Sequence, residues 1–183
     1  MTDMPAGSPQ VARQMVLMRH AQAAPAPFGE MGMHADLERP LTPHGHETAA
    51  RQGAWLRARH FAPELVLVSP SLRTRQTLDA IGSFYGDQAP DIRYVNTLYD
   101  ATAETIRDSL YAVPDKINNI MILGHNPGLQ GLVLHWAGGH CPPGLENMLI
   151  RGFPPASIAC FTTDQRWNTA TDGEIRLVEL SCQ

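Results

Sequence analysis

Two short apolar runs in this chain each end in a histidine. Residues 16–18 lead into Arg19 and His20, and residues 120–123 lead into Gly124 and His125. Apolar runs of this length, followed by loop residues, are typical of buried strands. In an open α/β sheet, ligands bind just beyond the carboxyl ends of the strands. Because a guanidinium binds phosphate oxygens through a bidentate fork, this pattern predicts a phosphate site.

A third apolar run adds a second arginine. Residues 64–68 end in Ser69 and Pro70, and Arg73 follows in the first turn of an expected helix. A neutral imidazole can attack phosphorus and form a phosphohistidine, which water later hydrolyses. Nearby arginines keep that imidazole neutral by disfavouring its cation. A second imidazole and the arginines would stabilise the charge of the transferring phosphoryl group, and this arrangement requires no metal.

Strands that alternate with helices must position these groups. The predicted strands are 14–18, 64–68, 92–95, 119–123, 157–161 and 174–180, and the predicted helices are 42–59, about 70–85, 103–113 and 127–136. This alternation predicts an α/β three-layer sandwich, in which helices cover both faces of a mostly parallel central sheet. The last two strands are expected to form a hairpin that places one antiparallel strand in the sheet. Long loops are expected over 21–41 and 137–155, and loops of that size are usually functional or mobile.

Length and composition fit one catalytic domain over 14–183, preceded by a flexible arm over 1–13 that is rich in proline and small residues. A net charge of −4 argues against a nucleic-acid or anionic-membrane partner, since such surfaces need clustered lysine and arginine. Three cysteines without a C-x-x-C pair favour free thiols in a reducing compartment. With no membrane-length apolar stretch and no signal peptide, the expected location is the cytoplasm.

Four ordered motifs carry a resemblance that covers most of the chain. Leu17–Ala21 is similar to the RHG signature, and Arg39–Gly45 matches R-P-L-T-x-x-G. Val68–Thr77 matches S-P-x-x-R-x-x-Q-T, and Gly124–Pro127 matches the segment that holds a second histidine. The chain thus resembles the histidine phosphatase superfamily, which is also called phosphoglycerate-mutase-like. Its small size and its lack of a helical insertion resemble the compact SixA-type branch, the phosphohistidine phosphatases.

The resemblance implies a phosphoglycerate-mutase-like fold without a cofactor or a metal. It implies that His20 is the nucleophile and that Arg19, Arg73 and His125 form the phosphate pocket around it. The expected partner is a protein that carries phosphohistidine, or a small phosphorylated substrate, and the product is inorganic phosphate. Two alternatives stay open: a small-molecule phosphomonoester phosphatase on the same scaffold, and a phosphate-binding module without turnover.

The chain departs from the family pattern in two places. Ala21 replaces the glycine of RHG, so an ordinary backbone conformation is expected there, since alanine takes positive φ only at a cost. No general acid is evident either: Asp100 and Glu104 are candidates, although an acid in a helix's first turn, such as Glu104, has an ordinary structural explanation. Imidazole leaves phosphorus more easily than an alkoxide does, and a weak acid therefore favours a phosphohistidine substrate.

Other polar residues have plainer interpretations. His44 and His46 face different sides of a helix, so a solvated pair is expected, not a metal site with Glu47. Arg75 falls on a variable motif position and is expected to be solvated. Ser69 is interpreted as a cap or turn residue. Arg39 either lies near the site or anchors the long loop.

Overall fold

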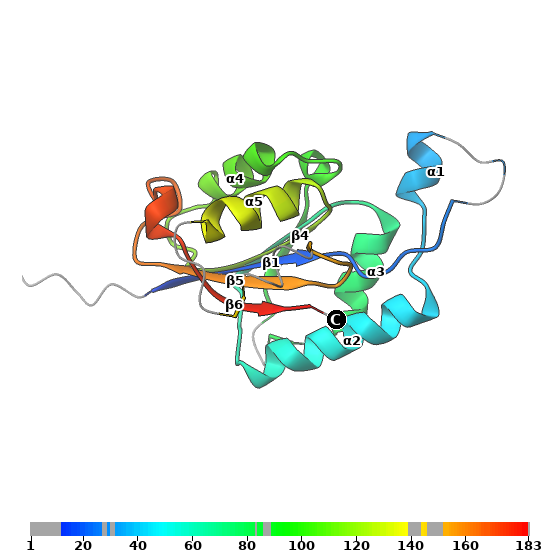
Figure 1. The fold of residues 1–183 in the computed structure, drawn as a ribbon, viewed down its shortest axis with the longest axis horizontal. Helices are drawn as coiled ribbons and strands as arrows, with labels where there is room; N and C mark the ends of the chain where they lie inside the picture. Colours follow the sequence, from blue (N-terminus) through cyan, green and yellow to red (C-terminus); the bar gives the residue numbers. More distant parts are fainter. Residues whose placement is uncertain are drawn as a thin grey trace, which may run out of the picture.

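A six-stranded sheet forms the middle layer of the computed structural model (Figure 1). Its strands are β1 (Arg13–Arg19), β2 (Leu65–Val68), β3 (Asp91–Tyr94), β4 (Asn119–Gly124), β5 (Ile158–Thr163) and β6 (Arg176–Ser181). They lie in the order β3-β2-β4-β1-β5-β6. The first four are mutually parallel, and β5 runs antiparallel to both β1 and β6. The predicted α/β sheet with one antiparallel strand is confirmed.

The structure describes residues 12–26, 29, 32–82, 84–85, 89–138, 144–145 and 152–182. Residues 1–11 of the predicted arm and most of the predicted loop over 137–155 lie outside these segments. Within them, no helix combines the length and the apolar character needed to span a bilayer.

Helices cover both faces of the sheet (Figure 1). They are α1 (Met33–Leu37), α2 (Pro43–Ala58), α3 (Leu72–Ile81), α4 (Ala103–Tyr111) and α5 (Gly128–Ala137), with 3₁₀ turns η1 (Asn96–Leu98) and η2 (Asp172–Glu174). Central strands covered on both faces are continuously apolar, because each alternate residue enters a different core. Ile120 and Ile122 of β4 pack on the α4–α5 side, while Met121 and Leu123 pack on the α2–α3 side.

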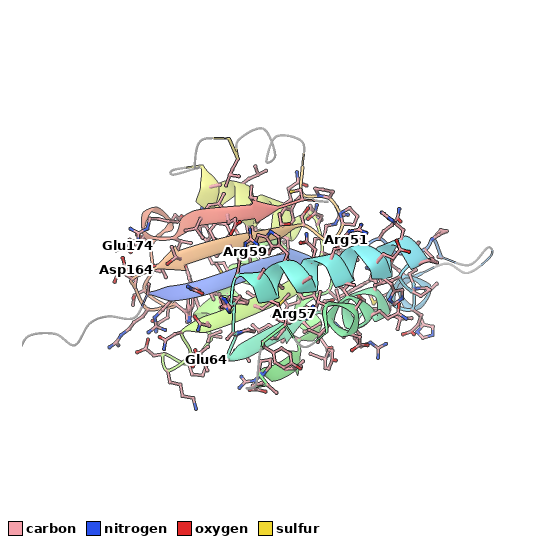
Figure 2. All side chains as sticks on the ribbon, turned by 90° about the horizontal axis from the view of Figure 1, so that it is seen from below. Arg51, Arg57, Arg59, Glu64, Asp164 and Glu174 are labelled. Carbon is pink, nitrogen blue, oxygen red and sulfur yellow. The ribbon has the colours of Figure 1, made fainter. Side chains whose placement is uncertain are left out.

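Helix α2 crosses one face of the sheet and carries Arg51 and Arg57, and Arg59 follows its last residue (Figure 2). Asp164 and Glu174 lie far from the start of α2, in the connection between β5 and β6 (Figure 2). Thr42 caps α2 by accepting a hydrogen bond from the Gly45 N–H at 2.9 Å, as expected for a hydroxyl before Pro43.

One predicted helix end and one predicted loop are wrong. The helix predicted to reach residue 85 ends at Ile81, because Gly82 has φ 63°, a conformation that glycine supplies at helix ends. The segment 21–41, predicted as a loop, contains α1 and an antiparallel bridge between Ala23 and Leu41. The bridge therefore pairs the two ends of this segment with each other.

Close contact between α2 and α3 depends on Gly53. A Cβ added there would lie 2.0 Å from the Ile81 carbonyl oxygen, whereas one added at Gly131 of α5 would meet only the Ala103 Cβ, at 3.6 Å. We expect Gly53→Ala to lower the free energy of unfolding by about 1–3 kcal/mol. Gly131→Ala should raise it by about 0.5–1 kcal/mol, since alanine is the better helix former. Urea denaturation of both variants tests this, and equal stabilities would contradict it.

Candidate active site

Three parallel strands bring the predicted residues to one edge of the sheet. Arg19 ends β1 opposite Gly124 of β4, and the His20 N–H donates to the Gly124 carbonyl at 3.0 Å. Arg73 lies in the first turn of α3, directly after β2. The groups line a cavity of about 430 Å³. Its lining residues are Arg19, His20, Asp36, Arg39, Arg73, Tyr99, Asp100, His125 and Asn126.

The ring of His20 is held in one tautomer. Its Nδ1 lies 2.8 Å from the Ala21 carbonyl oxygen. Since a carbonyl can only accept, Nδ1 must carry the hydrogen, and Nε2 presents a lone pair. Ala21 is not among the described residues with positive φ, so the expected ordinary backbone at this position is confirmed.

Both imidazoles are neutral near physiological pH. Burial, helped by the charges of Arg73 and Arg19, lowers the pKa of His20 to about 4. Burial also lowers the pKa of His125 to about 3, and His20 and Arg73 add to this effect. The two ring centroids lie 5.0 Å apart. The cavity thus combines a neutral nucleophilic nitrogen with a second neutral imidazole.

Asp36 of α1 is a component of the site that the sequence did not indicate. Its carboxylate accepts from Arg73 Nη2 at 2.9 Å, Arg39 Nη1 at 2.9 Å and the Tyr99 hydroxyl at 2.6 Å. Its backbone carbonyl accepts from Arg73 Nη1 at 2.6 Å. Although burial acts in the opposite direction, Tyr99, Arg39 and Arg73 hold the pKa of this carboxyl well below its usual range. Asp36 is therefore a fixed negative charge that orients Arg73.

A backbone carbonyl shortly before β5, that of Phe153, fixes two more groups. Phe153 accepts from Arg19 Nη1 at 2.8 Å and from Asn126 Nδ2 at 2.9 Å. Three buried atoms of the cavity have no hydrogen-bond partner among the described residues: Arg19 Nε, His125 Nδ1 and Asn126 Oδ1. Buried polar groups are normally satisfied, so unpaired ones in a cavity mark a place where a ligand binds.

The sequence matches the family model "Histidine phosphatase superfamily (branch 1)" over residues 15–98. An uncharacterized protein of Mycobacterium tuberculosis is 33% identical over 162 residues, covering 88% of this chain and 96% of its own. A putative phosphohistidine phosphatase SixA from Nakamurella multipartita has a similar structure, at 30% identity and a TM-score of 0.77 over 98% of each chain. This chain belongs to the histidine phosphatase superfamily.

A second similar structure is that of the protein histidine phosphatase SixA complexed with tungstate. It has 25% sequence identity and a TM-score of 0.68, covering 91% of this chain and 95% of its own. The phosphoglycerate-mutase-like fold expected from the sequence motifs is confirmed by these likenesses.

The two candidate acids lie in different places. Asp100 lines the cavity and has φ 52°, a conformation that is uncommon for residues other than glycine. Glu104 is exposed in the first turn of α4 and is not among the lining residues. The structure therefore brings Asp100, and not Glu104, together with His20.

The other residues singled out from the sequence lie partly at the cavity and partly outside it. Arg39 lies near the site, which was one of its two interpretations: it lines the cavity, while its hydrogen bonds to Ala24 and Asp36 stay within the segment 21–41. Arg75, expected to be solvated, is half-buried on α3 outside the cavity lining. His44 and His46 are both exposed. Ser69, interpreted as a cap or turn residue, instead contacts His125, with Oγ 2.7 Å from Nε2.

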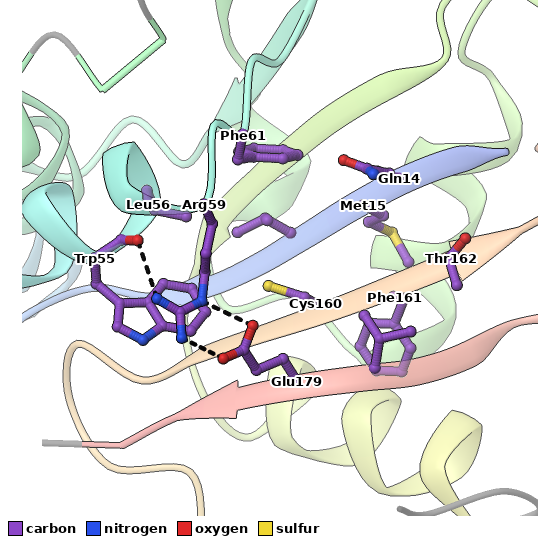
Figure 3. Close-up of a pocket in the computed structure, with 12 residues that line it drawn as sticks. Gln14, Met15, Trp55, Leu56, Arg59, Phe61, Cys160, Phe161, Thr162 and Glu179 are labelled. Atoms are coloured by element: carbon purple, nitrogen blue, oxygen red, sulfur yellow. Dashed lines mark hydrogen bonds and ion pairs between the residues drawn. The ribbon is translucent and has the colours of Figure 1, made fainter. Parts of the chain in front are cut away.

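A second cavity, about 360 Å³, lies between α2 and the strands β1, β5 and β6 (Figure 3). Arg59 stacks on the Trp55 ring at 3.6 Å and pairs with Glu179 at its rim. Burial raises the pKa of the Cys160 thiol to about 12, so this cysteine is not a nucleophile. The arginine of this cavity is paired with Glu179, and no histidine is among its described lining residues, so it offers no imidazole for phosphoryl transfer.

Proposed function

We propose that this protein is a metal-independent phosphatase that forms a phosphohistidine on His20 and removes phosphate from phosphohistidine on a protein, such as a phosphotransfer domain. The observation that carries the proposal is the fixed tautomer of His20, which leaves Nε2 unprotonated inside a cavity lined by Arg19, Arg73 and His125. The tungstate bound in the SixA structure supports an oxyanion site in the same fold.

The reaction has two displacement steps. His20 Nε2 attacks phosphorus, so that a new N–P bond forms while the substrate's N–P bond breaks and its imidazole departs. Water then attacks the phosphoryl group, the bond to Nε2 breaks, and inorganic phosphate is released. Arg19 and Arg73 are placed to balance the charge of the transferring group, which is the main catalytic demand of phosphoryl transfer.

The carboxyl groups of the cavity support phosphohistidine as the substrate. Asp36 is held ionised and has no proton to donate, which leaves Asp100 as the one lining carboxyl group available for that task. An alkoxide leaving group needs a proton, whereas imidazole can leave as the neutral base once its distal nitrogen is protonated. A site in which no carboxyl group is placed by a hydrogen bond to act as a general acid is better matched to the imidazole leaving group.

Asp100 is also the observation that favours the second candidate, a phosphatase of small phosphomonoesters. Its strained backbone places a carboxyl group at the cavity, and strain of this kind is concentrated at functional sites. If Asp100 donates a proton to an alkoxide, Asp100→Asn will reduce hydrolysis of monoesters more than that of phosphohistidine.

The deciding experiment compares phosphate release from a phosphohistidine-bearing phosphotransfer domain with release from a panel of sugar and nucleotide monophosphates. Each assay is run with and without EDTA, so that a metal requirement would show as activity lost when EDTA is added. We expect release from the phosphohistidine domain to have the higher kcat/KM. A preference for monoesters would support the second candidate, and phosphate binding without release from any substrate would indicate a binding module.

Two free cysteine thiols are relevant to the cellular compartment of the protein. Cys160 and Cys182 are both free. Free cysteines suit a reducing environment, which supports the cytoplasm as the proposed location and a cytoplasmic phosphoprotein as the proposed partner.

A further inference from the structure

Ser69 and His125 meet at the carboxyl ends of neighbouring strands. Ser69 follows β2 and His125 follows β4, which pair in parallel. Both residues are buried, Ser69 completely, and the Oγ–Nε2 distance is 2.7 Å. Among the described residues, Nε2 of His125 is the only hydrogen-bond partner of the Ser69 hydroxyl. The contact therefore joins the two side chains and serves no turn or helix cap.

Only two hydrogen arrangements fit a neutral His125. In the first, the hydroxyl of Ser69 donates to Nε2, and the ring hydrogen is on Nδ1. In the second, Nε2–H donates to the hydroxyl oxygen, which leaves the serine hydrogen buried without an acceptor and Nδ1 as a bare lone pair. A buried donor without a partner costs about 1–3 kcal/mol, so the first arrangement is favoured.

The two arrangements differ in what they offer a phosphoryl group. Phosphoryl oxygens are acceptors, and the Nδ1 atom of His125 is buried with no partner among the described residues. In the first arrangement Nδ1–H is a donor that such an oxygen can satisfy. In the second, a lone pair would face an anionic oxygen and repel it.

We propose that Ser69 is a positioning residue, which donates its hydroxyl hydrogen to Nε2 of His125 and so makes Nδ1–H a donor to the transferring phosphoryl group. The proposal rests on the proposed function for the identity of that group. Ser69 acts through His125 and does not touch the reacting atoms. It does for the second histidine what the Ala21 carbonyl does for His20, namely fix which ring nitrogen carries the hydrogen.

The test has a spectroscopic arm that needs no substrate. In protein labelled with ¹⁵N-histidine, long-range ¹H–¹⁵N spectra distinguish a protonated from a bare ring nitrogen, and the His125 signals are assigned by their absence in His125→Asn. We expect His125 to carry its hydrogen on Nδ1 in the wild type and to show a mixture of tautomers in Ser69→Ala. A wild-type signal with the hydrogen on Nε2 would overturn the proposal, even if Ser69→Ala does not fold.

The kinetic arm measures hydrolysis of the phosphohistidine domain. Removing a residue that orients a side chain of the active site typically lowers activity by roughly 10- to 100-fold. We therefore expect kcat of Ser69→Ala to fall by that factor while KM changes little. Ser71→Ala is the matched control, because Ser71 is a buried serine between β2 and α3 whose hydroxyl contacts only the Thr74 hydroxyl among the described residues. Wild-type kcat in Ser69→Ala, or an equal loss in Ser71→Ala, would contradict the role. If no substrate is hydrolysed, the proposed function fails, while the spectrum still tests Ser69.

Discussion

We expect His20→Ala to lower phosphate release from the phosphohistidine domain by roughly 10⁴-fold or more, because the variant lacks the proposed covalent nucleophile. Arg19, Arg73 and His125 remain in the cavity, so the variant should still bind inorganic phosphate. The measurement is single-turnover release, together with trapping of the phosphoenzyme in acid-free denaturant. His46→Ala is the control, because this histidine is exposed on α2. A His20→Ala protein that turns over at the wild-type rate excludes His20 as the nucleophile.

The same nucleophile sets the acid limb of the pH profile. Attack requires the neutral imidazole, and burial with the nearby arginines lowers the pKa of His20 to about 4. The neutral form therefore persists as the pH falls from 6.5 towards 4, and kcat/KM should decline only near pH 4. A decline centred near pH 6.5, the ordinary value for histidine, would contradict this assignment.

Arg73→Ala is expected to lower kcat/KM by roughly 10²- to 10³-fold, the usual loss when one donor to a developing anion is removed. Arg73 is buried, and two of its nitrogens are held by the Asp36 carbonyl and carboxylate. Arg73→Lys should recover little, since a single ammonium cannot reproduce this fork. Steady-state kinetics on the phosphohistidine domain provide the measurement.

Arg75→Ala is the matched control for Arg73→Ala. Both arginines belong to α3, two residues apart, but Arg75 does not line the cavity. The control should keep the wild-type kcat/KM. Equal losses in the two variants would show that α3 as a whole, and not the Arg73 guanidinium, had been damaged.

The residues of the site that lie at the carboxyl ends of strands could be predicted from the sequence. Short apolar runs located β1, β2 and β4, and parallel pairing then required Arg19, Arg73 and His125 to converge. This inference needs only the continuous apolar runs of buried strands and the rule that parallel strands end at one edge.

Asp36 and Tyr99 could not be predicted in the same way. Helix α1 has five residues, and Gly32 provides no side-chain cap, so no periodicity or start signal marks it. Whether Asp36 reaches Arg73 depends on the path of the chain after β1, which tertiary contacts such as the bridge from Ala23 to Leu41 decide. The interpretation of Ser69 as a turn residue was wrong for the same reason: its partner is 56 residues away.

The carboxylate of Asp36 competes with an entering phosphoryl group for the same hydrogen-bond donors. In the free protein, hydrogens of Arg73, Arg39 and Tyr99 are already given to this carboxylate. A phosphoryl group that enters must share or take over donors that are occupied, so it gains less than it would from bare guanidinium groups. The same competition applies to the product, since the Asp36 carboxylate can accept these hydrogen bonds again as phosphate leaves. In the proposed phosphatase, this competition would weaken the binding of inorganic phosphate and so reduce product inhibition.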